Sequence, residues 1–170
     1  MKALQAQFIN EGRELLEGIG ASMLQFEKSP EDSDNLNNLF RHVHTLKGNC
    51  GLFEEFRPVG LVLHAAEDTL DAVREGQRAL RTKDSDLLLN AMDFVSMALD
   101  DWEAGRYVES AYLEQATTLA CAIRQMDVPA VDPAEAETLV NALLHKESAP
   151  SQSGLPDWVE RILLHIKPHD

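Results

Sequence analysis

Apolar residues recur at helical spacing along the first 126 residues of the chain. Between residues 5 and 28 they fall three or four positions apart, the spacing of one face of an α-helix: Phe8, Leu15, Ile19, Met23 and Phe26. The same period returns in the segments 34–51, 58–75, 85–104 and 108–126. No segment shows the alternation of apolar and polar residues that marks a half-buried strand. The pattern therefore predicts an all-α chain.

Capping residues, glycine and proline predict where these helices begin and end. Pro58 suits the first turn of the third helix. Gly76 and Gly105 are expected to end the third and fourth helices. The predicted N-caps are Ser33 or Asp34 for the second helix and Asp84 or Ser85 for the fourth. Because short connections favour antiparallel neighbours, we expect an antiparallel four-helix bundle with an additional fifth helix.

The character of the sequence changes after residue 126. The stretches "DVPAVDP" and "ESAPSQSGLP" are rich in proline, serine and glycine and read as linkers. Between and after them, segments 134–146 and 157–167 are predicted to be short helices. The expected organisation is a helical bundle over residues 1–126, followed by a linker with a short helical C-terminal tail over residues 127–170.

Charge and composition narrow the possible partners. The chain has 170 residues and a formal net charge of −14, so nucleic acid and anionic membrane surfaces are not expected as partners. It has no apolar run of membrane-spanning length and no signal-peptide core, so a cytoplasmic location is expected. Its two cysteines, Cys50 and Cys121, fall in apolar helical patterns and fit no zinc site. They are predicted to be reduced core thiols, and no metal site is expected.

The stretch "FRHVHTLKGNCGLF" carries unusual residues for one helix. His44, Gly48 and Gly51 are spaced i, i+4 and i+7 and therefore share a face. Each glycine inside a helix costs roughly 0.5–1 kcal/mol relative to alanine, so this surface is expected to need access. Lys47 places a cation beside His44. An exposed neutral imidazole with a nearby cation suits a histidine that accepts a negatively charged group.

"HTLKGNCG" resembles the signature of histidine phosphotransfer (HPt) domains, and "LVLHAAEDTLDAVREGQ" resembles the third helix of the phosphotransfer domain of CheA-type chemotaxis kinases. The resemblance covers roughly residues 8–99. It implies that His44 is phosphorylated on Nε2, that Lys47 favours the phosphoryl charge and that Gly48 leaves space. It also implies that His64 and Glu67 form a hydrogen-bond network with the imidazole. The turn "GLFEEF" departs from the family by being one residue longer than usual.

The resemblance also implies partners. The kinase catalytic domain is expected to donate the phosphoryl group, and the receiver domain of a response regulator to accept it. Mg²⁺ and ATP are expected on those partner domains, because this chain has no glycine-rich phosphate loop. No cofactor is expected on the chain itself. For docking, we expect Phe40, Arg41 and Gly51 to contact the partner.

The resemblance implies the N-terminal phosphotransfer piece of a CheA-like histidine kinase, a phosphocarrier without an ATP site of its own. Other interpretations remain beside this one. The chain could be a free-standing phosphorelay protein, or a helical adaptor without chemistry. A carboxylate-bridged metal enzyme needs Glu-x-x-His pairs on two helices of a bundle. The chain instead has the reverse order once, in His64 and Glu67, which argues against that class.

Overall fold

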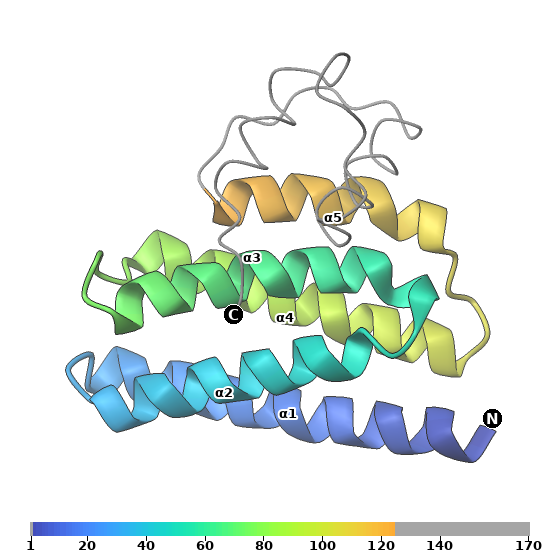
Figure 1. The fold of residues 1–170 in the computed structure, drawn as a ribbon, viewed down its shortest axis with the longest axis horizontal. Helices are drawn as coiled ribbons and strands as arrows, with labels where there is room; N and C mark the ends of the chain where they lie inside the picture. The colour runs from blue at the N-terminus through green and yellow to red at the C-terminus, as the bar shows by residue number, and fades with distance from the viewer. Residues whose placement is uncertain (1, 125–170) are drawn as a thin grey trace.

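Five α-helices make up the part of the chain that the computed structural model describes, residues 2–124 (Figure 1). Within these residues there is no strand, and the predicted all-α class is confirmed. The elements are α1 (Lys2–Lys28), α2 (Ser33–Cys50), the 3₁₀ helix η1 (Glu54–Phe56), α3 (Arg57–Arg74), α4 (Thr82–Glu103) and α5 (Glu109–Ile123). The predicted linker and tail helices of 127–170 lie outside the described residues.

Helices α1 to α4 form an antiparallel bundle, and α5 packs against α3 and α4 on the side away from α1 and α2 (Figure 1). Helix α3 is therefore covered by α2, α4 and α5. This position explains why its sequence is apolar on several faces rather than on one stripe. Its buried residues are Pro58, Val59, Leu61, Val62, Leu63, Ala65, Ala66, Glu67, Thr69 and Leu70.

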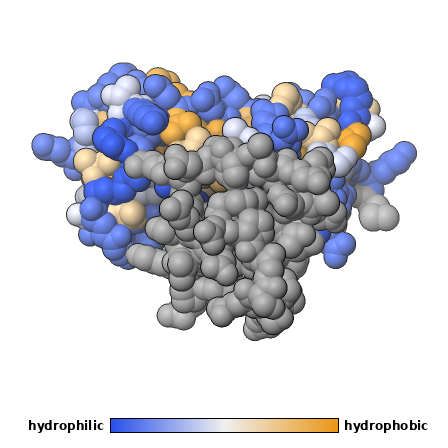
Figure 2. All heavy atoms as spheres, turned by 90° about the horizontal axis from the view of Figure 1, so that it is seen from above, coloured by the Kyte–Doolittle hydropathy of each residue, from blue (hydrophilic) through white to orange (hydrophobic). Residues whose placement is uncertain are grey.

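The predicted apolar stripes form the core. In α1, Phe8, Ile19, Met23 and Phe26 are buried, while Leu15 is half-buried against the same core. Hydrophilic residues dominate the coloured part of the face that Figure 2 shows, with small apolar patches between them. No helix within residues 2–124 is long and apolar enough to cross a bilayer.

Both cysteines lie in this core as free thiols, as predicted. Burial raises the pKa of Cys50 to about 12 and also raises the pKa of Cys121. Across residues 2–124 there is no group of three or more His, Cys, Asp or Glu side chains that could hold a metal ion.

The predicted helix stops are confirmed, but the predicted N-caps are wrong by a few residues. Gly76 and Gly105 have φ of +74° and +73°, the left-handed conformation that glycine favours after a helix. Helix α2 is capped by Asp32, whose side chain accepts a hydrogen bond from the backbone N–H of Asn35 at 3.0 Å. The backbone of Asp32 is still extended, so the helix begins one or two residues before the positions predicted.

Helix α4 has a different N-terminal arrangement. Its N-cap is Arg81, and Asp84 lies three residues further on. The carboxylate of Asp84 accepts the backbone N–H of Arg81 at 2.9 Å, which is the reciprocal half of a capping box. Asp84 therefore stabilises the helix start without being its N-cap.

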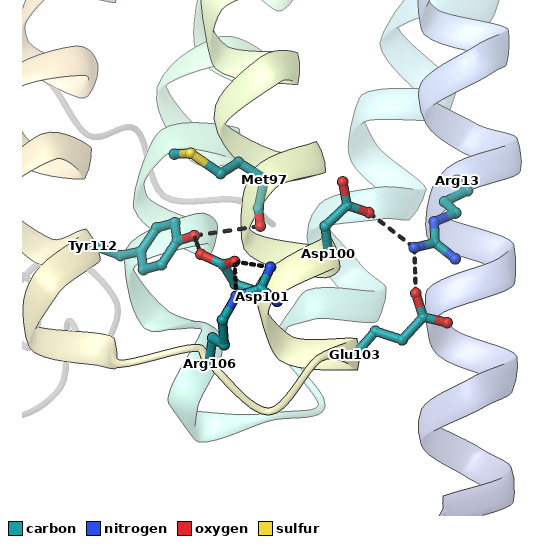
Figure 3. Close-up of polar contacts among 7 residues, drawn as sticks. All are labelled: Arg13, Met97, Asp100, Asp101, Glu103, Arg106 and Tyr112. Atoms are coloured by element: carbon teal, nitrogen blue, oxygen red, sulfur yellow. Dashed lines mark hydrogen bonds and ion pairs between the residues drawn. The ribbon is translucent and has the colours of Figure 1, made fainter.

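Two groups of polar contacts at the C-terminal end of α4 join it to α1 and to α5 (Figure 3). Arg13 of α1 reaches Asp100 and Glu103 of α4. Arg106 and Tyr112 both contact the carboxylate of Asp101 (Figure 3). These contacts hold α1 and the start of α5 against the end of α4.

Aromatic rings near the second group of contacts hold the η1 turn in place. Phe56 of η1 stacks on Tyr107, with ring centroids 5.0 Å apart, and lies edge-on to Trp102 of α4 at 4.8 Å. The hydroxyl of Tyr107 donates to the carbonyl oxygen of Glu55 at 2.6 Å. The longer turn noted in the sequence is therefore a short 3₁₀ helix anchored by rings from α4 and from the α4–α5 connection.

Candidate functional site

His44 lies on the outer surface of α2, with 61% of its side chain exposed. Its Nδ1 is 3.2 Å from Oε2 of Glu67 on α3. Lys47, one turn further along α2, places its Nζ 3.0 Å from the same oxygen. The structure therefore brings together three of the predicted site residues, from two helices that pack side by side.

Glu67 is the buried member of this trio, with only 1% of its side chain exposed. Burial by itself would raise its pKa, but the hydrogen bonds from Lys47 and His44, with the positive charge of Lys47, outweigh burial and hold the pKa below its ordinary value. The carboxylate is thus ionised at neutral pH and can only accept hydrogen bonds. In the neutral imidazole the proton must then sit on Nδ1, which leaves the lone pair of Nε2 free.

Gly48 lies on the exposed surface of α2, four residues after His44. A Cβ atom built at Gly48 would meet nothing within 4 Å. Packing therefore does not require glycine here, and the absence of a side chain leaves the surface next to His44 open. Gly51, the C-cap residue of α2, is also exposed. A Cβ there would come within 3.4 Å of the carbonyl oxygen of Gly48, an ordinary contact.

A hollow of about 580 Å³ lies next to these glycines, between the C-terminal end of α2, η1 and the start of α3. It supplies the open space that the glycine spacing predicted. Its lining includes Lys47, Gly48, Gly51, Phe53, Phe56, Arg57 and His64.

His64 faces this hollow from α3, and its Nε2 lies 3.6 Å from Oδ2 of Asp68, one turn further on. Asp68 is in turn bound by Arg124, at the end of α5, at 2.8 Å. That His64 belongs to the hydrogen-bond network of the His44 imidazole stays a prediction. Asp68 could have been found from its i+4 spacing to His64. Arg124 could not, because its contact depends on how α5 packs against α3.

Phe40 lies one turn before His44, half-buried against the core. Its ring is nearly parallel to the imidazole of His44, with an interplanar angle of 14° and centroids 6.0 Å apart. The guanidinium carbon of Arg74, at the end of α3, lies 3.9 Å from the centroid of the Phe40 ring. Arg41 is exposed. The docking role of Phe40 and Arg41 stays a prediction, and the contact of Arg74, which is distant along the chain, was not predicted.

Residues 3–98, more than half of the chain, match the family model of the Hpt domain, and the chain therefore belongs to the Hpt domain family. Its relatives include the chemotaxis protein CheA of Salmonella typhimurium, 30% identical over 162 residues that cover 92% of this chain and 24% of the relative. The CheA of Halobacterium salinarum is 31% identical over 97 residues, 57% of this chain and 14% of the relative. The chain thus spans a quarter or less of the length of these two relatives.

A solved structure gives the same classification. The phosphorylated P1 domain of CheA3, in complex with CheY6 from R. sphaeroides, matches with a TM-score of 0.62 and 27% sequence identity. The match covers 74% of this chain and 95% of the P1 chain. The bundle is therefore an Hpt bundle of the CheA P1 type.

Proposed function

We propose that this chain is the phosphotransfer domain of a CheA-like chemotaxis kinase. In this role His44 accepts a phosphoryl group from the kinase catalytic domain and passes it to an aspartate of a response regulator. The observation that carries the proposal is the contact of 3.2 Å between Nδ1 of the exposed His44 and the buried carboxylate of Glu67. The similarity to CheA proteins of several organisms favours this role over that of a free-standing phosphorelay protein.

This geometry supports phosphorylation of His44 on Nε2. The lone pair of Nε2 attacks the terminal phosphorus of ATP held by the catalytic domain, where Mg²⁺ also binds. The new N–P bond forms as the bond between phosphorus and the oxygen of the leaving ADP breaks. The ring gains positive charge as Nε2 donates its electron pair. Glu67, which accepts the hydrogen bond from Nδ1–H, stabilises that charge.

Lys47 acts on the same step through Glu67. Its ammonium keeps the buried carboxylate ionised, so the imidazole stays in the form with a free Nε2. It also places positive charge next to the surface where the phosphoryl group arrives.

Transfer to the regulator reverses these changes. An aspartate oxygen of the receiver attacks the phosphorus, the N–P bond breaks and the electron pair returns to Nε2. The receiver must approach closely for this in-line attack. The open surface at Gly48 and the hollow beside it are compatible with such an approach. Because ATP and the regulator are cytoplasmic, we place the reaction in the cytoplasm.

The test is the replacement His44→Gln. The variant is incubated with a CheA kinase domain and labelled ATP, and phosphate that is stable to alkali but labile to acid is measured. We expect labelling to be lost. His42→Gln is the matched control, since the ring of His42 faces Gly18 on α1 rather than Glu67. Circular dichroism checks that both variants fold. Labelling of His44→Gln at the wild-type level would refute the proposed function.

A further inference from the structure

Three side chains of α2 and α3 contact one another in turn: His44, Phe40 and Arg74. The rings of His44 and Phe40 are nearly parallel, and the guanidinium of Arg74 covers a face of the Phe40 ring at 3.9 Å. Arg74 is itself fixed by Asp71, at 2.7 Å on the same helix. Phe40 is thus held between the core and a cation while it packs along the imidazole.

His44 needs such a neighbour because most of its side chain is in solvent. The hydrogen bond to Glu67 fixes where Nδ1 lies, but a single hydrogen bond leaves the ring free to turn about that bond. A flat ring packed nearly parallel to the imidazole restricts this rotation. The two contacts together define the direction in which the Nε2 lone pair points.

Phe40 can also act electrostatically. The π face of an aromatic ring attracts a cation within about 6 Å of its centroid. The imidazole becomes positive as Nε2 attacks phosphorus, and its centroid lies 6.0 Å from that of Phe40. The ring is therefore placed to favour the charged form of His44 over the neutral one.

From these contacts we infer that Phe40 and Arg74 are positioning residues for the phosphoacceptor His44. Phe40 orients the imidazole, and Arg74 acts only through Phe40 by fixing its ring. The inference rests on the proposed function, since it assigns these residues to the phosphorylation of His44. It differs from a docking role for Phe40, in which the ring would contact the partner and leave the imidazole unaffected.

Phosphoramidate separates orientation from docking, because it phosphorylates histidine without a partner protein. Nε2 attacks its phosphorus, the bond between phosphorus and the amino nitrogen breaks, and ammonia leaves. With this donor we expect Phe40→Leu to slow phosphorylation of His44 about tenfold and Arg74→Gln about threefold, in keeping with the strength of aromatic and cation–π contacts. Rates at the wild-type level in both variants would overturn the inference.

Two matched controls guard against general destabilisation. Arg106→Gln removes another exposed arginine that is paired with an aspartate, far from His44. Phe26→Leu makes the same aromatic-to-leucine change in the buried face of α1. Both controls should keep the wild-type rate. Arg74 lies at the surface, so its variant keeps the inference testable even where Phe40→Leu folds poorly.

The double variant Phe40→Leu/Arg74→Gln tests whether Arg74 acts through Phe40. Because Arg74 acts through Phe40, Arg74→Gln should have no further effect in the Phe40→Leu background. Independent, multiplying effects would contradict this coupling. NMR provides a second readout, since the ring protons of His44 should lose part of their ring-current shift in Arg74→Gln.

The kinetics of phosphorylation by the kinase domain distinguish a positioning role of Phe40 from a docking role. Positioning predicts that kcat falls in Phe40→Leu while KM is unchanged. A raised KM with an unchanged kcat and an unchanged phosphoramidate rate would assign Phe40 to docking and overturn the inference. The proposed function would survive that result, because the loss of labelling in His44→Gln tests it separately.

Discussion

At the scale of single residues, Gly48 is a position where glycine weakens the helix but leaves the surface next to His44 open. It lies inside α2, its conformation needs no glycine and an added Cβ would meet open space. A glycine in a helix interior weakens the helix by roughly 0.5–1 kcal/mol relative to alanine. The residue therefore keeps a surface open at the expense of helix stability.

Replacement of Gly48 by glutamine should separate the two effects. We expect the free energy of unfolding to rise by about 0.5 kcal/mol, because glutamine is a better helix former. Transfer from His44 to a receiver should slow, because the longer side chain obstructs the approach. Urea unfolding and single-turnover transfer measure the two quantities.

Gly20→Gln is the control for this replacement, since Gly20 of α1 also has nothing within 4 Å of an added Cβ. It should stabilise the protein and leave transfer unchanged. Equal transfer rates for wild type and Gly48→Gln would mean that the glycine does not serve access.

Glu67→Gln tests the role of the buried carboxylate that faces His44. The change removes the charge that faces Nδ1 of His44 and leaves Lys47 beside a neutral amide. A hydrogen bond to a charged group contributes about 1.5–3 kcal/mol, so phosphorylation by the kinase domain should slow about 10- to 100-fold. The ¹⁵N shifts of the His44 ring should show loss of the tautomer protonated on Nδ1. An unchanged rate with unchanged shifts would remove Glu67 from the site.

The site residues differ in how far the sequence could identify them. His44, Lys47 and Gly48 belong to one helix, so their i, i+3 and i+4 spacing is enough to place them together on its surface. Glu67 follows from the family resemblance and the pairing of α2 with α3. Arg74 and Arg124 needed the actual packing of helices, because nothing in local spacing relates them to Phe40 or Asp68.

At the scale of elements, the connection between α3 and α4 depends on one buried carboxylate. Asp84 is bound by Arg78 and by both the backbone and side chain of Arg81. Burial alone would raise its pKa, but these hydrogen bonds outweigh burial and lower the pKa to about 2. The sequence predicted Asp84 as a possible N-cap of this helix. It did not predict that Asp84 lies inside the first turn.

Asp84→Asn should therefore destabilise the protein in a pH-dependent way. The pKa is lower in the folded than in the unfolded chain, where it is about 3.9, so the stabilisation is fully present above that pH. It should amount to about 2 kcal/mol at pH 7 and decline as the pH falls toward about 2. Urea unfolding at pH 7, 5 and 3 measures this.

Asp86→Asn, at an exposed position of the same helix, is the control and should change stability little at any pH. A difference between wild type and Asp84→Asn that is the same at pH 7 and pH 3 would contradict the role of the ionised carboxylate.

At the scale of the whole molecule, the net charge of −14 sets the conditions for docking. A response regulator presents an acidic, Mg²⁺-binding pocket, which an acidic body as a whole repels. Arg41, at i−3 from His44, places exposed positive charge beside it, whereas Lys47, at i+3, is paired with Glu67. Contact is expected to be small in area and transient, because a phosphate carrier must release its partner.

Arg41→Glu should weaken binding of the receiver, and more strongly at about 0.01 M than at about 1 M salt, because the screening length shortens from about 30 Å to about 3 Å. Titration by NMR at the two salt concentrations measures the effect. Lys83→Glu, an exposed charge reversal at the start of α4, is the control and should change affinity less. A loss of affinity that does not depend on salt would exclude an electrostatic role for Arg41.

The buried thiols have a practical consequence. A thiolate is the reactive form of cysteine, and burial both shields Cys50 and Cys121 and raises their pKa. A new cysteine at a solvent-exposed position can therefore be labelled selectively while the two native ones remain in place. Leu52, 73% exposed and next to the residues that line the hollow, is such a position. A fluorophore attached there would report the arrival and departure of each partner in real time.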